Sequence, residues 1–451
     1  MVKLNWFIRQ VFEIREGGFS VFLNKMIYVF SVIKWPINGI WAIPGVMIIR
    51  LLRPFILVRM TEIWSDRIGH FSTDSLVHLS RKILKLESER IFDLYTYSEG
   101  KICNQQWAKM VRRHLPVFWW VKYLLFYNQL IPKGKIHNGP SIVSGRDYQG
   151  LIHRSNAKLE FTCKEELDAK SWMRNYGWSD GEPFVCIAVR DSKYLAEMSP
   201  SFEQGLKLCS YHNYRDGDIE DYYPVVHKLL QKGYWVVRMG KTAYKPMLNL
   251  PRVIDYPFVE DQADLLDIWL CANCHFFIST GLGIDSVATC YSRPQVYVNT
   301  LPMSYLRSIA PMIVAPKHLT WVKTGEYLNL SEHWIHRYQE GDLYEQAGIC
   351  VSDLTPEEIT EIVFEMDQRI DGSWEDKEED LLSQRKFWDT FKRLAQDPNI
   401  FNEFLSGLQC KGWVEPKNNK GDNFAAIHGW KHPEARVACS YLRKMGDAYF
   451  E

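Results

Sequence analysis

A series of short apolar segments between residues 184 and 299 most constrains what this chain can fold into. The segments are rich in β-branched and aromatic residues and cover residues 184–190, 234–240, 252–257, 275–280 and 295–299. Helical or loop sequence separates them. Short strands that alternate with helices are typical of a parallel, doubly wound sheet. The sequence therefore predicts an α/β fold in which these segments are the strands.

The residues just after each predicted strand indicate where a ligand binds, because open parallel sheets bind ligands at the carboxyl ends of their strands. The candidates at these ends are Arg190, Asp191, Arg238, Gly240, Asp255, Ser279, Thr280, Gly281 and Gly283. Arginine holds phosphate oxygens, and glycines let the backbone turn sharply against a ligand. A helix that begins near Ile284 would add free N–H groups. The pattern predicts a phosphorylated, pyrophosphate-bearing ligand.

The pentapeptide Cys271–His275 matches the pattern for covalent haem attachment. Its position argues against haem, because the cysteines end a predicted helix, His275 begins a predicted strand, and no export signal is visible. A structural zinc site would need a second cysteine pair. We therefore interpret Cys271 and Cys274 as buried free thiols, with haem or metal binding as the alternatives.

Residues 26–49 form a strongly apolar stretch that is long enough to span a bilayer. Pro36 and Pro44 fall inside it, however, and would break a spanning helix. The sequence favours a hairpin of two short helices at the membrane surface, and a helical subdomain buried against the rest of the chain is the alternative. We expect residues 1–54 to attach the protein peripherally to the cytoplasmic face of the cell membrane.

Composition narrows the function classes. The 451 residues suffice for two or more domains. The formal net charge of +0 gives no reason to expect a nucleic-acid partner, whose phosphates call for a basic surface. The ten cysteines are scattered along the chain rather than arranged as a disulfide framework, which is typical of a reducing cytoplasm.

From about residue 55 onward the chain resembles a family of bacterial glycosyltransferases known mainly from sequence. The stretches that carry the resemblance are RIGHF, VRDSKYL, YHNYRDGDIEDYYPVVHKLLQKGYWVVRMGK, FFISTGLGIDSVA, RPQVYVN, DLTPEEITEIVFEM and HGWKHPEARVACSYLRK. More distantly, IAVRD is similar to a region of fucosyltransferases in which the arginine holds the donor diphosphate. Ala188 stands where that family has histidine, so the donor's identity does not carry over.

The resemblance implies the GT-B fold, in which two Rossmann-like domains face a cleft, and work on surface polysaccharides at the cytoplasmic membrane. The domains it implies are a helical membrane-associated segment (1–54), an acceptor-side domain (55–165), a donor-binding domain (166–365) and helices that pack back on the first domain (366–451).

In a fold of this kind the loop after the first strand of the acceptor-side domain faces the cleft. Here that loop holds His70, which we predict as the catalytic base of an inverting transferase, with Asp66 and Asp74 in reserve. A lone histidine is more often structural, and a retaining enzyme would need no such base.

Asp216 and Asp218 form a literal Asp-x-Asp sequence, which holds a divalent metal in the other large glycosyltransferase fold. Because they precede a helix, we interpret them as caps of free N–H groups and predict no metal site. His212 and Arg215, just upstream, are further donor-binding candidates.

The sequence thus predicts a metal-independent transferase with no cofactor besides its substrate. Its expected partners are a nucleotide-sugar donor, a glycan or lipid-linked glycan acceptor and the membrane surface. Two alternatives remain open. One is a sugar-nucleotide-modifying enzyme of the same fold, an epimerase or a pyruvyl transferase. The other is a non-catalytic scaffold of polysaccharide assembly.

Overall fold

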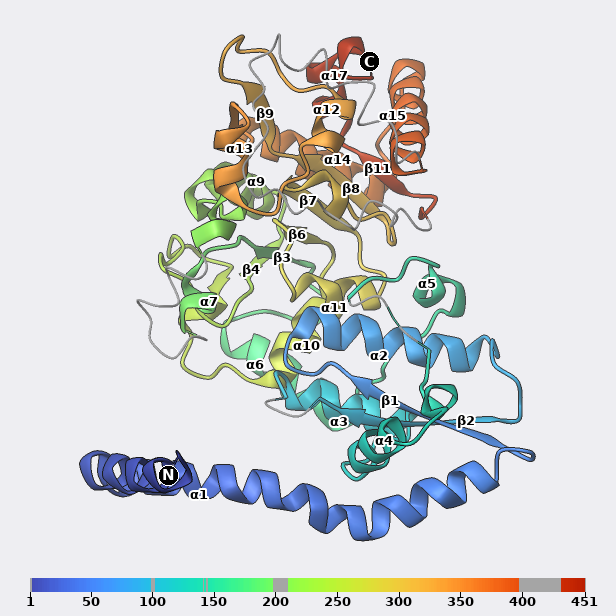
Figure 1. Ribbon diagram of the computed structural model, residues 1–451. Coiled ribbons are helices and arrows are strands. Elements are labelled where there is room, and N and C mark those ends of the chain that lie inside the picture. The colour runs from blue at the N-terminus through green and yellow to red at the C-terminus, as the bar shows by residue number, and fades with distance from the viewer. Residues whose placement is uncertain are drawn as a thin grey trace. The chain divides into compact units, whose positions relative to one another are not determined.

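The computed structural model describes residues 2–98, 102–140, 142, 145–197, 210–396 and 431–450 (Figure 1). The chain forms two compact units that interleave along the sequence. Unit 1 comprises Met1–Trp64, Lys85–Gly100 and Arg112–Ser141, and unit 2 comprises Ser65–Leu84, Lys101–Val111 and Ile142–Glu451. These units differ from the sequential domains that the resemblance implies, with boundaries after residues 54, 165 and 365.

Unit 1 contains two parallel strands, β1 (Leu57–Ile63) and β2 (Ile91–Tyr97). Two helices, α1 (Val2–Leu51) and α4 (Val121–Leu130), pack together beside them, and the short 3₁₀ helix η1 (Gly134–His137) follows α4. The core of the unit consists of Ala42, Val46, Val58, Met60, Leu94, Val121, Tyr123 and Leu124. The resemblance implies a Rossmann-like domain over residues 55–165, and this domain stays a prediction; the sheet in the described part of unit 1 has two strands.

The N-terminal segment does not break at the prolines of its apolar stretch. α1 consists of two helical parts that meet at a kink at Gly18, at φ 64° and ψ −158°, and an ion pair between Lys25 and Glu13 at 2.6 Å joins the two parts. The second part continues through Pro36 and Pro44, so the hairpin of two short helices predicted within residues 26–49 is wrong. Proline in a helix removes one backbone hydrogen bond and bends the helix without having to end it. Within the described residues, no helix is both long enough and apolar enough to cross a membrane.

Unit 2 is built on a seven-stranded sheet with the order β11-β8-β7-β6-β3-β4-β5, in which every pairing is parallel. All five strands predicted from the sequence are present: β3 (Phe184–Ala188), β4 (Trp235–Arg238), β5 (Val253–Asp255), β6 (Phe277–Ser279) and β7 (Gln295–Thr300). The chain crosses from β5 back to β6, so the strand order reverses between β3 and β6. This α/β architecture confirms the predicted parallel, doubly wound sheet.

Helices cover the sheet on both faces. α14 packs with α9 and α17 over one face, where Val226, Ile359 and Ile362 belong to one apolar cluster (Figure 1). α10 packs against α6 and α11. The helices with most of their residues in unit 2 are α2 (Ile68–Ile83), α3 (Gln105–His114), α5 (Leu151–Ser155), α6 (Cys163–Asn175), α7 (Lys193–Glu197), α9 (Tyr223–Gln231), α10 (Asp264–Asn273), α11 (Asp285–Cys290), α12 (Leu330–Ile335), α13 (Gly341–Gln346), α14 (Pro356–Asp371), α15 (Glu378–Gln396) and α17 (Cys439–Met445).

Two strands of this sheet were not predicted from the sequence. They are β8 (Met312–Pro316) and β11 (Ala435–Val437), which pair with each other in parallel. An antiparallel pair, β9 (His318–Trp321) and β10 (Ile349–Ser352), follows β8. Because β11 completes the sheet and α17 packs against α14, residues 431–450 belong to unit 2. That the C-terminal helices (366–451) pack back on the first domain, as the resemblance implies, stays a prediction.

Candidate functional site

The carboxyl ends of β3 and β6 meet at the point where the strand order reverses. The backbone N–H of Arg190, just after β3, donates to Oγ1 of Thr280, just after β6, at 2.9 Å. Thr280 in turn donates its own N–H to the carbonyl oxygen of Ala188 at 3.2 Å. The two predicted strand-end segments therefore form one edge, as the rule for open parallel sheets requires.

Arg190 is held at this edge by Asp216. Its Nε lies 3.1 Å from Oδ1 of Asp216, and both side chains are largely buried. Burial raises the pKa of Asp216, while Arg190 opposes that shift. Lys317, directly after β8, donates to the carbonyl oxygen of Asp216 at 2.8 Å and pairs with Asp353 at 2.5 Å. Asp216 thus links the loops that follow two strands.

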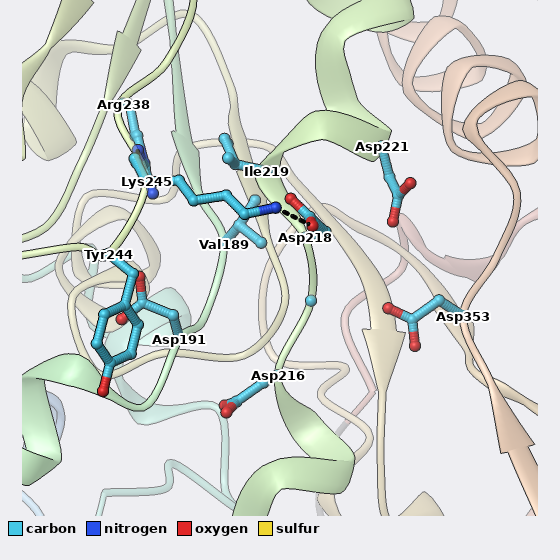
Figure 2. A pocket seen from close by; sticks show the side chains of 11 residues that line it. Val189, Asp191, Asp216, Asp218, Ile219, Asp221, Arg238, Tyr244, Lys245 and Asp353 are labelled. Atoms are coloured by element: carbon cyan, nitrogen blue, oxygen red, sulfur yellow. Dashed lines mark hydrogen bonds and ion pairs between the residues drawn. The ribbon is translucent and has the colours of Figure 1, made fainter.

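A cavity of about 400 Å³ opens beside Arg190, and Figure 2 shows the side chains around it. Lys245 reaches toward Asp218, and Tyr244 lies next to Asp191. The lining residues are Val189, Asp191, Asp216, Gly217, Asp218, Ile219, Asp221, Arg238, Tyr244, Lys245 and Asp353. Carboxylates accept hydrogen bonds from hydroxyl groups, so this lining suits a polyhydroxylated ligand such as a sugar or ribose.

Arg238 lines the cavity, and Asp255 lies beside it. The buried Arg238 donates to the carbonyl oxygen of Lys245 at 2.6 Å and lies 3.4 Å from Oδ1 of Asp255. Asp255 also accepts the N–H of Met247 at 2.6 Å. Both side chains therefore hold the loop after β4 in place. Gly240 begins this loop at φ 147°, a backbone conformation that favours glycine.

The glycine-rich loop after β6 satisfies much of its own hydrogen bonding. Ser279 Oγ donates to Asp285 at 2.7 Å, and the same carboxylate accepts the N–H of Leu282 at 2.7 Å. Gly281, at φ 87°, donates its N–H to Ser279 Oγ at 2.9 Å. The sequence predicts free N–H groups here, but these two amides bond within the loop. The helix that follows, α11, has only six residues.

At this loop the backbone of Gly283 lies close to the backbone of Gly69. A Cβ built on it would lie 3.3 Å from the backbone nitrogen of Gly69, and one built on Gly69 would lie 3.0 Å from the Cα of Gly283. The glycines at both positions therefore let α2 begin directly against the loop after β6, which brings the following residue, His70, to this edge.

Five arginines gather around this loop; Arg67, Arg146, Arg190, Arg215 and Arg307 are hereafter the arginine cluster. Arg215 donates to the carbonyl oxygen of Gly281 at 3.0 Å, and both Arg146 and Arg215 lie over the ring of Tyr305. Arg307 pairs with Asp285 at 2.9 Å. Burial lowers the pKa of Arg215, and the positive charges of Arg190 and Arg307 lower it further.

Like charges raise one another's energy, and a bound anion relieves that repulsion. The arginine cluster is therefore a candidate anion site. Within the cluster the sequence points to Arg190 and Arg215 as donor-binding residues. Arg146 and Arg307 follow no predicted strand and carry no signal of their own. Lys317 follows β8 directly, so recognition of that strand would have found it.

His70 lies in the first turn of α2, and three members of the arginine cluster act on it. Burial lowers its pKa, and Arg67, Arg307 and Arg146 lower it further while Asp66 opposes them. A neutral imidazole is a proton acceptor. A Cβ added to Gly145, which has φ 72°, would lie 2.8 Å from Nδ1 of His70, so glycine keeps this contact open.

Asp74 lies one turn further along α2. Its Oδ1 accepts the N–H of Gly145 at 2.8 Å, and burial raises its pKa to about 7. His70 and Asp74 thus both contact Gly145, and both are candidate proton acceptors near neutral pH.

The Asp-x-Asp pair behaves as two separate residues. Asp218 accepts the N–H of Glu220 at 3.0 Å, as a cap of η3 (Ile219–Tyr222), and pairs with Lys245 at 2.6 Å. Asp216 pairs with Arg190 and does not cap the helix. The predicted capping therefore holds for Asp218 only. Across the described residues no group of three His, Cys, Asp or Glu side chains is placed to hold a metal ion. The side chain of His212, in η2 (Ser210–Arg215), lies outside the described part.

The cysteines of the Cys-x-x-Cys-His sequence are buried free thiols, as predicted. Cys271 lies in α10, and Cys274 follows its last residue with its Sγ 3.3 Å from the carbonyl oxygen of Cys271. Burial raises the pKa of Cys271 well above its ordinary value. These thiols lie outside the residues gathered around the arginine cluster.

Similarity between this chain and known proteins was found among solved structures. No model of a known protein family matches the chain. No curated protein matches it either. The similar solved structures include a glycosyl transferase of family 9 from Veillonella parvula, with 12% identity over 58% of this chain and 86% of that one at a TM-score of 0.33.

Two further similar structures come from E. coli. The ADP-heptose LPS heptosyltransferase II shares 12% identity, with 57% of this chain and 90% of that one covered and a TM-score of 0.31. The iron-containing dodecameric glycosyltransferase TibC shares 14%, with 55% and 61% covered and a TM-score of 0.30. All three are glycosyltransferases. Because the structures overlap so loosely, they assign no role to any residue of this chain. Its function is inferred from its own side chains.

Proposed function

We propose that the protein is a glycosyltransferase that moves a sugar from a nucleotide-sugar donor to a hydroxyl group of a glycan or lipid-linked glycan. The observation that carries the proposal is the arginine cluster next to His70 and Asp74. Breaking the glycosidic bond of a nucleotide sugar leaves negative charge on the diphosphate, and attack by a hydroxyl group requires loss of a proton. The cluster serves the first need, and His70 or Asp74 serves the second.

The donor diphosphate binds between Arg190, Arg215 and the glycine-rich loop in this proposal. Positive charge there stabilises the transition state more than the ground state, because the leaving group gains negative charge as the bond breaks. The neighbouring cavity, which is rich in carboxylates, receives the hydroxyl groups of the ribose or of the transferred sugar.

His70 is the proposed base, because its lowered pKa keeps the imidazole neutral at pH 7. Asp74 is the alternative base on the same helix. No metal enters the proposal, because Lys245 and Arg190 already pair with the two carboxylates of the Asp-x-Asp sequence. GT-B architecture stays part of the proposal, together with a role in surface-polysaccharide synthesis.

The test is product analysis with the full-length protein. We expect a UDP-, GDP-, CDP- or ADP-sugar to release nucleoside diphosphate, faster when lipid-linked glycans extracted from bacterial membranes are added, and labelled sugar to appear on the acceptor. A donor that changes only its own sugar would indicate an epimerase. Absence of nucleotide binding to correctly folded protein would indicate a scaffold. Either result would contradict the proposal.

A further inference from the structure

Helix α1 carries two apolar stripes on opposite sides. One stripe packs against α4: Ala42 and Val46 are fully buried, and a Cβ on Gly39 would lie 2.5 Å from the hydroxyl oxygen of Tyr127. The other stripe runs along the opposite side of the helix and is exposed. Its members are Ile33, Ile37, Ile40, Met47, Ile48 and Leu51. A helix that is apolar all round is normally covered on every side, yet no part of the chain that the structure describes covers this stripe.

The exposure is large and extends beyond α1. Ile40 and Leu51 are 77% and 73% exposed, and Phe55, just past the helix, is 77% exposed. On and around α4, in the same unit, Trp119 and Leu130 are 68% and 65% exposed. Large exposed apolar side chains gathered in one unit mark an interaction site.

The charge of unit 1 identifies the chemistry of the partner. Residues 17–61 and 112–141 contain no Asp or Glu at all. Unit 1 as a whole has 15 Lys and Arg against 7 Asp and Glu, a net charge of +8, and since the chain is neutral the remainder carries −8. Lys133 and Lys135, which come shortly after the end of α4, are exposed. A partner of this surface must therefore be anionic as well as apolar.

From this combination we propose that the exposed stripe of α1, with Trp119 and Leu130 beside α4, inserts into the headgroup layer of a bilayer that contains anionic phospholipid. Isoleucine, leucine and tryptophan enter the acyl boundary while lysine and arginine meet the phosphates. A second copy of the chain would bring two strongly positive surfaces together. A nucleic acid would leave the apolar stripe uncovered. The attachment is peripheral and independent of the proposed activity.

Flotation of the full-length protein with vesicles tests the proposal. Vesicles of phosphatidylcholine mixed with phosphatidylglycerol should bind it at least about tenfold more tightly than phosphatidylcholine alone, since each basic residue near an anionic surface adds to the attraction. Raising the salt concentration should weaken the binding, because salt screens exposed charges. Equal binding to both vesicle types, or binding to neither, would overturn the proposal.

Matched variants separate this surface from the rest of the protein. Ile40→Glu with Leu51→Glu should reduce binding to the mixed vesicles by at least about tenfold, because both charges would have to enter the lipid. Leu167→Glu with Val322→Glu, at positions of unit 2 that are 60% and 69% exposed, should leave it unchanged. Equal loss in both pairs would contradict the assignment of the surface.

Charge variants test the second half of the argument. Lys133→Gln with Lys135→Gln should weaken binding to the mixed vesicles and leave binding to pure phosphatidylcholine unchanged, whereas Lys164→Gln with Lys323→Gln, on exposed lysines of unit 2, should change neither. Sedimentation should show a monomer without lipid. A dimer that the Ile40→Glu, Leu51→Glu variant dissociates would show that a second copy covers the stripe, and would overturn the proposal.

Discussion

Arg190 donates a hydrogen bond from Nε to Oδ1 of Asp216 across 3.1 Å, while its backbone carbonyl accepts the N–H of Gly217. A loop after β3 is thus tied twice to the residues before η3. Since both side chains are largely buried, the pair fixes the orientation of one arginine of the cluster at the carboxyl edge of the sheet.

The first prediction concerns this pair. Arg190→Ala should destabilise the protein by about 2 kcal/mol, because Asp216 loses a charged hydrogen-bond partner in a largely buried place. Asp216→Asn should cost less, and a double-mutant cycle should give a coupling of about 1 to 3 kcal/mol. Denaturant unfolding of the three variants measures the coupling. Strictly additive losses would show that the contact contributes nothing.

The second prediction concerns His70. His70→Ala should leave donor binding unchanged and lower kcat by about 10²- to 10⁴-fold, because a base acts on the acceptor hydroxyl and not on the nucleotide. The exposed His227→Ala on α9 is the matched control and should retain full activity. Loss of nucleotide affinity in a folded His70→Ala protein would place His70 in the donor site or in the structure.

The pH profile distinguishes the two candidate bases. If His70 is the base, kcat/KM should rise with pH through an apparent pKa below its ordinary value of 6.5. If Asp74 is the base, the midpoint should lie at about 7. The acid limb of the wild-type profile, compared with that of Asp74→Asn, decides between them. An unchanged acid limb in that variant supports His70.

The third prediction follows from the raised pKa of Asp74. Because the folded protein holds this proton up to about pH 7 and the unfolded chain releases it near 3.8, the carboxyl favours folding at low pH and loses that contribution as pH rises to 7. Asp74→Asn, which can still accept the N–H of Gly145, should therefore raise the unfolding free energy at pH 8, by up to about 4 kcal/mol, and change it little at pH 4. A variant equally or less stable at pH 8 would contradict the shift.

The fourth prediction is that activity survives chelation. Asp216 and Asp218 each pair with a cationic side chain, so neither is available as a metal ligand without breaking that pair. Turnover measured in EDTA should match turnover in Mg²⁺. Loss of turnover that Mg²⁺ or Mn²⁺ restores would show that the Asp-x-Asp sequence binds metal during catalysis.

Local sequence predicted the strands of unit 2 that carry their own composition signal. β3 to β7 are runs of β-branched and aromatic residues next to helices, and all five were found. β11 has only three residues, Ala435–Val437, and is a strand because β8 offers it a partner. Such pairing depends on tertiary contact, which short segments do not encode. Likewise Pro36 and Pro44 predicted a break, but the part of α1 that packs against α4 continues through both prolines, and the kink of α1 lies at Gly18.

The sequence likewise predicted some residues of the candidate site and missed others. Arg190 follows β3 and Arg238 ends β4, so the rule that ligands bind at the carboxyl ends of parallel strands predicted both. The structure places them at one edge of the sheet. Their roles depend on partners far along the chain, which that rule does not supply: Arg238 braces the loop at Lys245, while Arg190 joins the cluster. Arg146 and Arg307 reach the cluster from loops, where no periodicity indicates which way a side chain turns.

Calorimetric titration of nucleoside diphosphates into the full-length protein and its Arg215→Ala variant tests the central claim most directly. Arg215 is largely buried beside the charges of Arg190 and Arg307. One of UDP, GDP, CDP or ADP should therefore bind the wild type, and Arg215→Ala should weaken that binding by about 30-fold or more. Arg174→Ala, which removes an exposed ion pair with Asp180, should leave it unchanged. If no nucleoside diphosphate binds the wild type, or if Arg215→Ala binds as tightly, the arginine cluster is not a donor site and the account fails.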